Sequence, residues 1–177
     1  MTIAVGFSSE TFEFKSKYPK LWIAAYPVAN DNLVDPDDDA HKFLDGEYAV
    51  LGATGTLDRA AILNQNDADI MQAHHVTGNP GRGDLQFGQI PFCMDDQYLF
   101  RSRLHDGNVG AGTAPVTGEL CTLENATVVI EGTNYAGRTC LIALNTGADG
   151  YYVARAVDNA NDAGWITFYA TRGHWTA

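Results

Sequence analysis

Lysine does not occur after Lys42, and serine is found only at Ser8, Ser9, Ser16 and Ser102. None of these serines stands in a GxSxG pattern, so a serine hydrolase of the nucleophile-elbow type is not predicted. The chain has no run of 18 apolar residues, and its start lacks a basic segment followed by a long apolar one. We therefore expect a soluble protein that has no membrane partner and is not secreted by the ordinary route.

Positive charge is scarce as well: 22 acidic residues stand against 11 lysines and arginines, and the formal net charge is −11. Proteins gain most of their nucleic-acid affinity by neutralising phosphates with lysine and arginine, so no nucleic-acid partner is expected. Hydrophobic residues make up 45% of the 177 residues, and charged residues only 19%. This composition predicts a folded chain with a single core.

Cysteine is present only at Cys93, Cys121 and Cys140, without CxxC spacing. Three cysteines in 177 residues are too few for a disulfide-rich scaffold. We favour buried reduced thiols, with a bridge from Cys121 to Cys140 across a hairpin as the alternative. Cys93 lies between an apolar stretch and two aspartates, an environment that raises the pKa of a thiol and disfavours a nucleophile.

The chain also lacks the residue spacings of known metal sites. His74 and His75 are adjacent, so they cannot present the i, i+4 pair of a zinc-binding helix. The acidic run at 35–39 offers alternating oxygen ligands, but Ala40 and Gly46 stand where an EF-hand loop needs glycine and glutamate. An irregular calcium site stays open as an alternative. The sequence predicts no metal, no cofactor and no catalytic residue, and therefore a protein that is not an enzyme.

Residues 74–92 are rich in glycine and proline, which predicts a long surface loop. An adhesion tripeptide lies within this segment, formed by Arg82, Gly83 and Asp84. We treat these three residues as candidates for an exposed binding loop, although so short a motif often occurs by chance. Just before them, residues 69–75 are expected to form one helical turn or a loop, with Asp67 as its N-cap.

Strand patterns dominate the rest of the sequence. Residues 47–53 and 56–63 predict a hairpin, with a short helix as the alternative for the second segment. Further strands are predicted at 97–105, 118–123, 126–132, 138–145, 150–157 and 164–172. Regularly spaced short strands are typical of an all-β fold, and we predict a single antiparallel β-barrel or sandwich domain with long loops.

The first part of the chain differs from this body. Residues 11–18 alternate aromatic with charged side chains, which predicts an extended strand or arm with one apolar face. A second apolar segment ends at Pro27, and a proline there favours the periphery of a sheet. We therefore divide the chain into an N-terminal arm with an acidic linker, 1–42, and a β-rich body domain, 43–177.

The C-terminal segment 164–177 contains two of the three tryptophans, with an arginine and a histidine. Alternation places Ile166, Phe168 and Ala170 on one face of a strand, and Trp165, Thr167, Tyr169 and Thr171 on the other. Bulky groups on both faces predict packing against the chain's own core on one side and against a second layer or another subunit on the other. The strand is expected to end at Gly173, so that Trp175 lies in a short tail that anchors a subunit contact.

Taken together, the arm, the hairpin at 45–60 and the late segments PVTGELCTL, GYYVARAVDN and GWITFYATRG resemble tailed-bacteriophage head decoration proteins, also called capsid cement proteins. The resemblance implies a small β-rich structural subunit, made in the host bacterial cytoplasm, that docks on the outer surface of the mature capsid in the virion. It further implies the phage major capsid protein as a partner, whose contacts the subunit stabilises, and self-association, with a trimer preferred and a dimer possible.

Under this hypothesis the candidate contacts with the capsid or with other subunits are aromatic and lysine side chains: Phe7, Phe12, Phe14, Lys15, Lys17, Tyr18, Trp22, Trp165, Tyr169 and Trp175. The arm's aromatics either fill pockets of a neighbour to which the arm adds as a strand, or pack on the chain's own core, and both interpretations are open. The alternative function is a glycan- or receptor-binding β-module of a phage tail or fibre, in which Trp165, Trp175, Tyr151 and Tyr152 stack on sugars.

Overall fold

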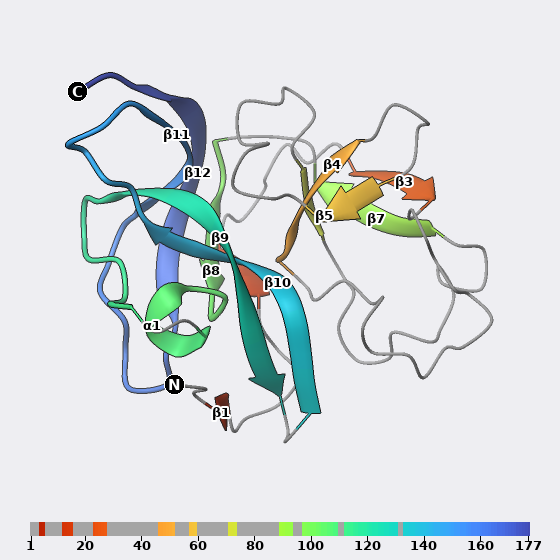
Figure 1. The fold of residues 1–177 in the computed structure, drawn as a ribbon. Coiled ribbons are helices and arrows are strands. Elements are labelled where there is room, and N and C mark those ends of the chain that lie inside the picture. Colours follow the sequence, from red (N-terminus) through yellow and green to blue (C-terminus); the bar gives the residue numbers. More distant parts are fainter. Residues whose placement is uncertain are drawn as a thin grey trace.

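The computed structural model describes residues 4–5, 12–15, 23–27, 46–51, 57–59, 71–73, 89–93, 97–109, 112–130 and 133–177. Within these ranges the chain forms strands in two sheets and one short helix, α1 (Asp106–Val109) (Figure 1). The all-β prediction is confirmed, and neither described sheet closes into a barrel. No helix in the described part of the chain is long and apolar enough to cross a membrane.

The large sheet follows the order β1-β9-β11-β12-β8-β2, and β10 pairs with β9. All its strand pairs are antiparallel except β1 with β9. The strands are β1 (Ala4–Val5), β2 (Phe12–Phe14), β8 (Leu99–Ser102), β9 (Leu120–Ile130), β10 (Thr133–Ala143), β11 (Gly150–Ala156) and β12 (Ile166–Trp175). The strand nearest the C-terminus, β12, therefore lies inside the sheet, between β11 and β8.

The small sheet is antiparallel throughout, in the order β3-β7-β6-β4-β5. Its strands are β3 (Ile23–Pro27), β4 (Tyr48–Leu51), β5 (Leu57–Arg59), β6 (Met71–Ala73) and β7 (Gln89–Cys93). The predicted hairpin is confirmed by the pairing of β4 with β5. The prediction that the segment ending at Pro27 is peripheral is also confirmed, because β3 is the edge strand.

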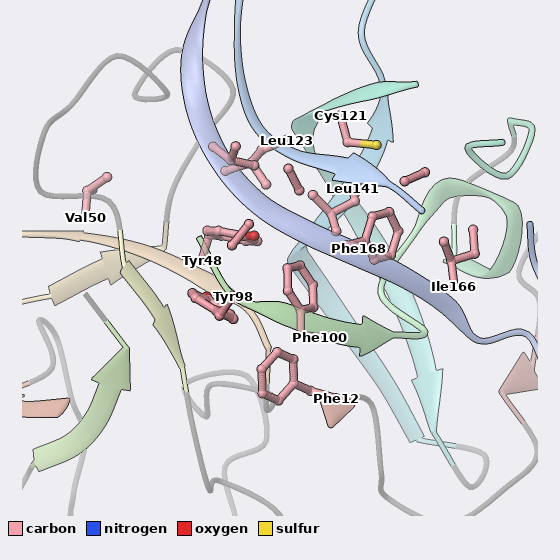
Figure 2. Close-up of a cluster of buried hydrophobic side chains, with 14 residues drawn as sticks. Phe12, Tyr48, Val50, Tyr98, Phe100, Cys121, Leu123, Leu141, Ile166 and Phe168 are labelled. Atoms are coloured by element: carbon pink, nitrogen blue, oxygen red, sulfur yellow. The ribbon is translucent and has the colours of Figure 1, made fainter. Parts of the chain in front are cut away.

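The core lies between the large sheet and the start of β4. Phe100 on β8 packs against Phe168 on β12, with ring centroids 5.4 Å apart, and against Phe12 on β2, with centroids 5.5 Å apart (Figure 2). The ring centroids of Tyr98 and Phe100 are 5.6 Å apart, and Tyr48 of the small sheet belongs to the same cluster of buried side chains. One continuous apolar core thus includes residues of both sheets.

Several sequence predictions need correction. Residues 71–73 form β6 rather than a helical turn, and the end of the loop predicted at 74–92 belongs to β7, because each segment pairs with a strand of the small sheet. The two strands predicted at 118–123 and 126–132 are one strand, β9, which β10 pairs along its length. β12 does not end at Gly173, since Gly173 pairs with Tyr152 and the strand continues to Trp175.

The division into an arm at 1–42 and a body does not coincide with a division between sheets. β1 and β2 belong to the large sheet and β3 to the small one, so the described parts of the arm are built into both. Each contributes an edge strand.

Buried and exposed side chains alternate along β12, and substitutions at two neighbouring positions test this burial pattern. Phe168→Ala removes a fully buried ring and should lower the free energy of unfolding by about 3–5 kcal/mol. Tyr169→Ala, one residue further on and facing solvent, should change it by only about 0.5 kcal/mol. Urea unfolding followed by circular dichroism measures both. Equal losses for the two variants would contradict the burial pattern.

Candidate functional site

The seat of β2, meaning the place on β8 that β2 occupies, is the first candidate interaction site. β2 pairs with β8 through Phe12 with Ser102, Glu13 with Arg101, and Phe14 with Phe100, and the N–H of Lys15 donates to the carbonyl of Leu99 at 2.8 Å. The Phe12 side chain is only 5% exposed. It rests against Gly46, whose φ is +90°, and a Cβ added there would come within 2.8 Å of the Phe12 side chain. Gly46 therefore makes room for the ring.

A charged cluster surrounds this seat. Glu13 forms ion pairs with Arg101 and, at 3.0 Å, with Lys15. Partial burial raises the pKa of Glu13, but hydrogen bonds from Lys15 and Arg101 and their positive charges outweigh it, so the pKa lies below its ordinary value. The guanidinium groups of Arg101 and Arg103 lie 4.6 and 4.5 Å from the ring centre of Trp165, within cation–π range.

The second candidate is the aromatic face, defined here by the exposed side chains of two cross-strand pairs of β11 and β12, Tyr151 with His174 and Arg155 with Tyr169. Trp175 follows His174 in the strand and pairs with Gly150, so its ring lies on the opposite side of the sheet from His174. Tyr151 and His174 are cross-strand partners with ring centroids 4.6 Å apart, and Arg155 stands opposite Tyr169. The exposed fractions of Tyr151, Tyr169 and Trp175 are 39%, 37% and 37%, which is high for large apolar side chains. Neither strand contains an acidic residue, although the chain carries a net charge of −11.

The end of β12 is held in place by hydrogen bonds to the loop before β11. The indole Nε1 of Trp175 donates to the carbonyl of Thr146 at 3.1 Å, and the N–H of Ala177 donates to Asp149 Oδ1 at 2.9 Å. Trp175 is therefore a preorganised, partly exposed ring in β12 rather than part of a tail beyond the strand. A fixed aromatic loses little side-chain entropy on binding.

A buried ion pair joins the two sheets. Arg138 Nη1 on β10 donates to Glu47 Oε2 at 3.2 Å, and both side chains are fully buried. The N–H of Thr139 donates to Glu47 Oε1 at 3.1 Å. The strand β10 has a bulge between Tyr135 and Arg138, where Gly137 has a φ of +67°, and a bulge of this kind redirects the side chain that follows it.

A second polar bridge runs beside the ion pair. Gln72 on β6 donates from Nε2 to the carbonyl of Gly46 at 3.1 Å and accepts a hydrogen bond from the Tyr98 hydroxyl at 2.5 Å. Gln72 is almost completely buried. The two bridges hold the Gly46–Tyr48 region between β6 and β10, so the glycine that accommodates Phe12 is fixed by polar contacts on both sides.

His105 occupies a buried corner next to α1. Its Nε2 lies 2.8 Å from the carbonyl of Gly164, so this nitrogen must carry the proton and donate. Asn108 Nδ2 donates to the same carbonyl at 2.6 Å. Burial lowers the pKa of His105, and the Gly164 hydrogen bond and the charge of Asp106 only partly oppose it. His105 therefore connects the segment after β8 to the turn before β12.

No reactive centre emerges from the described residues. In that part of the chain no group of three or more histidine, cysteine or acidic residues could hold a metal ion. Cys121 and Cys140 are free and buried, and burial raises the pKa of each thiol to about 12. The interpretation as buried reduced thiols is confirmed for these two cysteines, and no bridge joins them.

The sequence-predicted contact residues include buried, exposed and undescribed positions. Phe12 is buried in the core of its own chain, which agrees with one of the two interpretations left open for the arm's aromatics. Trp165 is also buried, beside Arg101 and Arg103. Tyr169 and Trp175 are exposed, as is Lys15. Phe14 is described only as a member of β2. Outside the described residues lie Phe7, Lys17, Tyr18, Trp22, Arg82, Gly83 and Asp84, with His74, His75 and the acidic run at 35–39.

Sequence reasoning missed the residues that fix these sites. Glu47, Gln72 and Arg138 lie in segments without a recognisable motif, and Glu47 is 91 residues from Arg138. The only sequence signal for a buried ion pair was that Glu47 and Arg138 are charged residues within predicted strands. Comparisons with protein-family models, with curated proteins and with solved structures found no match.

The ion pair predicts a large, asymmetric mutational effect. Glu47→Leu leaves the Arg138 charge buried without its carboxylate and should cost about 3–5 kcal/mol of unfolding free energy. Glu47→Leu combined with Arg138→Met removes both charges and should be less destabilised than Glu47→Leu alone. Lys15→Met, which removes an exposed pair, is the control and should cost less than about 1 kcal/mol. Urea unfolding gives all three free energies, together with that of Arg138→Met alone. If the loss in the double variant equals the sum of the losses in Glu47→Leu and Arg138→Met, Glu47 and Arg138 are not strongly coupled.

His105 predicts a pH dependence of stability. Its pKa is lowered in the folded state, so below its ordinary value of 6.5 the unfolded chain binds a proton that the folded chain does not. The free energy of unfolding should therefore fall as pH drops from 7.5 to 5.5, with a contribution of at most about 1.4 kcal/mol per pH unit. His105→Gln should remove this contribution from the slope, whereas His174→Gln, at an exposed position, should keep it. Identical slopes in wild type and His105→Gln would exclude the effect.

Proposed function

We propose that the protein is a structural subunit of a tailed-phage virion that binds the outside of the mature capsid and stabilises contacts between major capsid protein subunits. On this proposal it is a non-enzymatic all-β decoration protein that self-associates, as a trimer or a dimer. Three of the segments that resemble decoration proteins supply the start of β9, all of β11 and most of β12, and these strands form the middle of the large sheet.

The observation that carries the proposal is the aromatic face. Tyr151 and Tyr169 remain partly exposed on two neighbouring strands, together with Arg155 and without any acidic side chain in those strands. Trp175 adds a third partly exposed ring at the end of β12. Aromatic residues and arginine are enriched at the energetically important centres of protein interfaces. A chain that is acidic overall but presents a cationic, aromatic face favours a partner surface with carboxylates and apolar pockets.

The arm has a part in folding that the sequence-based docking hypothesis did not separate from capsid binding. Phe12 is part of the chain's own core, so removal of residues 1–20 would open that core as well as remove any contact with the capsid. Loss of capsid binding by such a truncated protein would therefore not identify the arm as the docking element. Substitutions on the aromatic face separate docking from folding more cleanly.

Mass spectrometry of purified virions of the encoding phage, followed by cryo-electron microscopy, is the primary test. We expect the polypeptide in the particles and its density on the outside of the head. Density on a tail or fibre, with binding to a glycan array, would instead support the glycan- or receptor-binding function, for which Tyr151 and Trp175 are the exposed rings. Absence from virions would refute both.

A substitution tests whether Trp175, the exposed ring at the end of β12, takes part in docking. Trp175→Ala should reduce affinity for capsids that lack the protein by about 30-fold, the equivalent of a 2 kcal/mol hot spot. Val116→Ala, at an exposed apolar residue outside β11 and β12, is the matched control and should bind as wild type. Both variants should fold, as checked by circular dichroism. Full capsid occupancy by folded Trp175→Ala would remove Trp175 from the interface.

A further inference from the structure

The N-terminal residues occupy edge positions in both sheets but form no sheet of their own. β1 and β2 are the two ends of the large-sheet path, and β3 is one end of the small sheet. Their partner strands are β9, β8 and β7, which all lie beyond residue 88. The described N-terminal strands are thus additions to sheets that later residues build, which is the geometry of strand augmentation within one chain.

The seat of β2 is selective for what it holds. The seat combines a pocket over Gly46 and Phe100, which buries the Phe12 ring, with the Arg101 guanidinium, which pairs with Glu13. The edge of β8 supplies backbone hydrogen-bond partners. The last of these hydrogen bonds runs from the N–H of Lys15 to the carbonyl of Leu99. An occupant therefore needs an extended backbone with an aromatic residue followed by an acidic one.

We propose that this seat is a strand-exchange site: in an oligomer of this chain, β8 of one copy receives residues 12–15 of a second copy. Phe12 of that copy then fills the core over Gly46, and Glu13 pairs with Arg101. The oligomer's interface contains the same contacts that one chain makes alone, so no new complementary surface is required. The inference rests on the self-association in the proposed function but not on capsid binding, and it says which contacts join the copies.

Chain length and strand size permit the exchange. β2 is a three-residue strand at an edge, so it can leave without disturbing a pairing between two other strands. Residues 16–22 connect Lys15 to β3, and a connection of this length spans on the order of 25 Å when fully extended. The occupant is fixed as a second copy because every copy carries the matching Phe-Glu sequence.

A disulfide between two different copies tests the proposal. Glu13 and Arg101 are directly opposite, and opposite residues in an antiparallel pair have Cα atoms about 4.5–5.5 Å apart, within the range that a disulfide bridges. Full-length Glu13→Cys and Arg101→Cys chains, each also carrying Cys93→Ala and a different affinity tag, are co-expressed and mildly oxidised. We expect the covalent heterodimer to be the main disulfide-linked product on a non-reducing denaturing gel, with the 13–101 linkage identified by peptide mass spectrometry.

The matched control pairs Glu13→Cys with Arg155→Cys, since Arg155 is exposed on β11, away from β8. This mixture should give little heterodimer. An equal yield from both mixtures would overturn the proposal, because random collision would explain it. A chain with both Glu13→Cys and Arg101→Cys provides the second measurement: covalent oligomers support exchange, whereas complete conversion to a monomer with an internal disulfide overturns it. A wild-type chain that is monomeric by light scattering would overturn it as well.

Discussion

The buried ion pair between Glu47 and Arg138 is the contact on which the relation between the two sheets depends. Taking two charges out of water costs several kcal/mol for each, and their attraction offsets this cost only when the geometry is good and further hydrogen bonds are present. Thr139 supplies such a bond to Glu47. A shift of the small sheet against the large one would leave one charge buried and unpaired. The ion pair therefore favours this one arrangement of the two sheets over others, and contributes less to the total stability of the fold.

The same contact reaches the candidate sites. By fixing the start of β4 it places Gly46, whose missing side chain makes the space for Phe12. Phe12 packs on Phe100, and the strand of Phe100 carries Arg101, which links Glu13 to Trp165. A chain of contiguous contacts thus runs from the small sheet through the seat of β2 to the turn before β12. The aromatic face takes no part in these contacts. Its strands, β11 and β12, pack other side chains into the core, so its own rings can stay exposed without a loss of packing.

Much of the fold could be read from local patterns, because local patterns record which face of a strand is buried. The alternation of Ile166, Phe168 and Ala170 predicted the inner face of β12 correctly, and the hairpin of β4 and β5 followed from its turn signal. β6 was mistaken for a helical turn because three residues are too short to show a period, and its strand conformation depends on β4 and β7. The burial of Trp165 and the pairing of Glu47 with Arg138 could not be predicted, since both depend on residues far apart in the sequence.

The central place of β12 in the large sheet has a consequence for biosynthesis. Residues 166–175 lie between β11 and β8, so these two strands have no connection within the sheet until that segment has been made. Phe12, synthesised about 150 residues earlier, packs against Phe100, which in turn stacks on Phe168 of β12. Phe12 and Phe100 therefore have no finished core around them until β12 has been synthesised. Folding of the large sheet must wait for that segment, and until then its apolar side chains are exposed to contacts that promote misfolding.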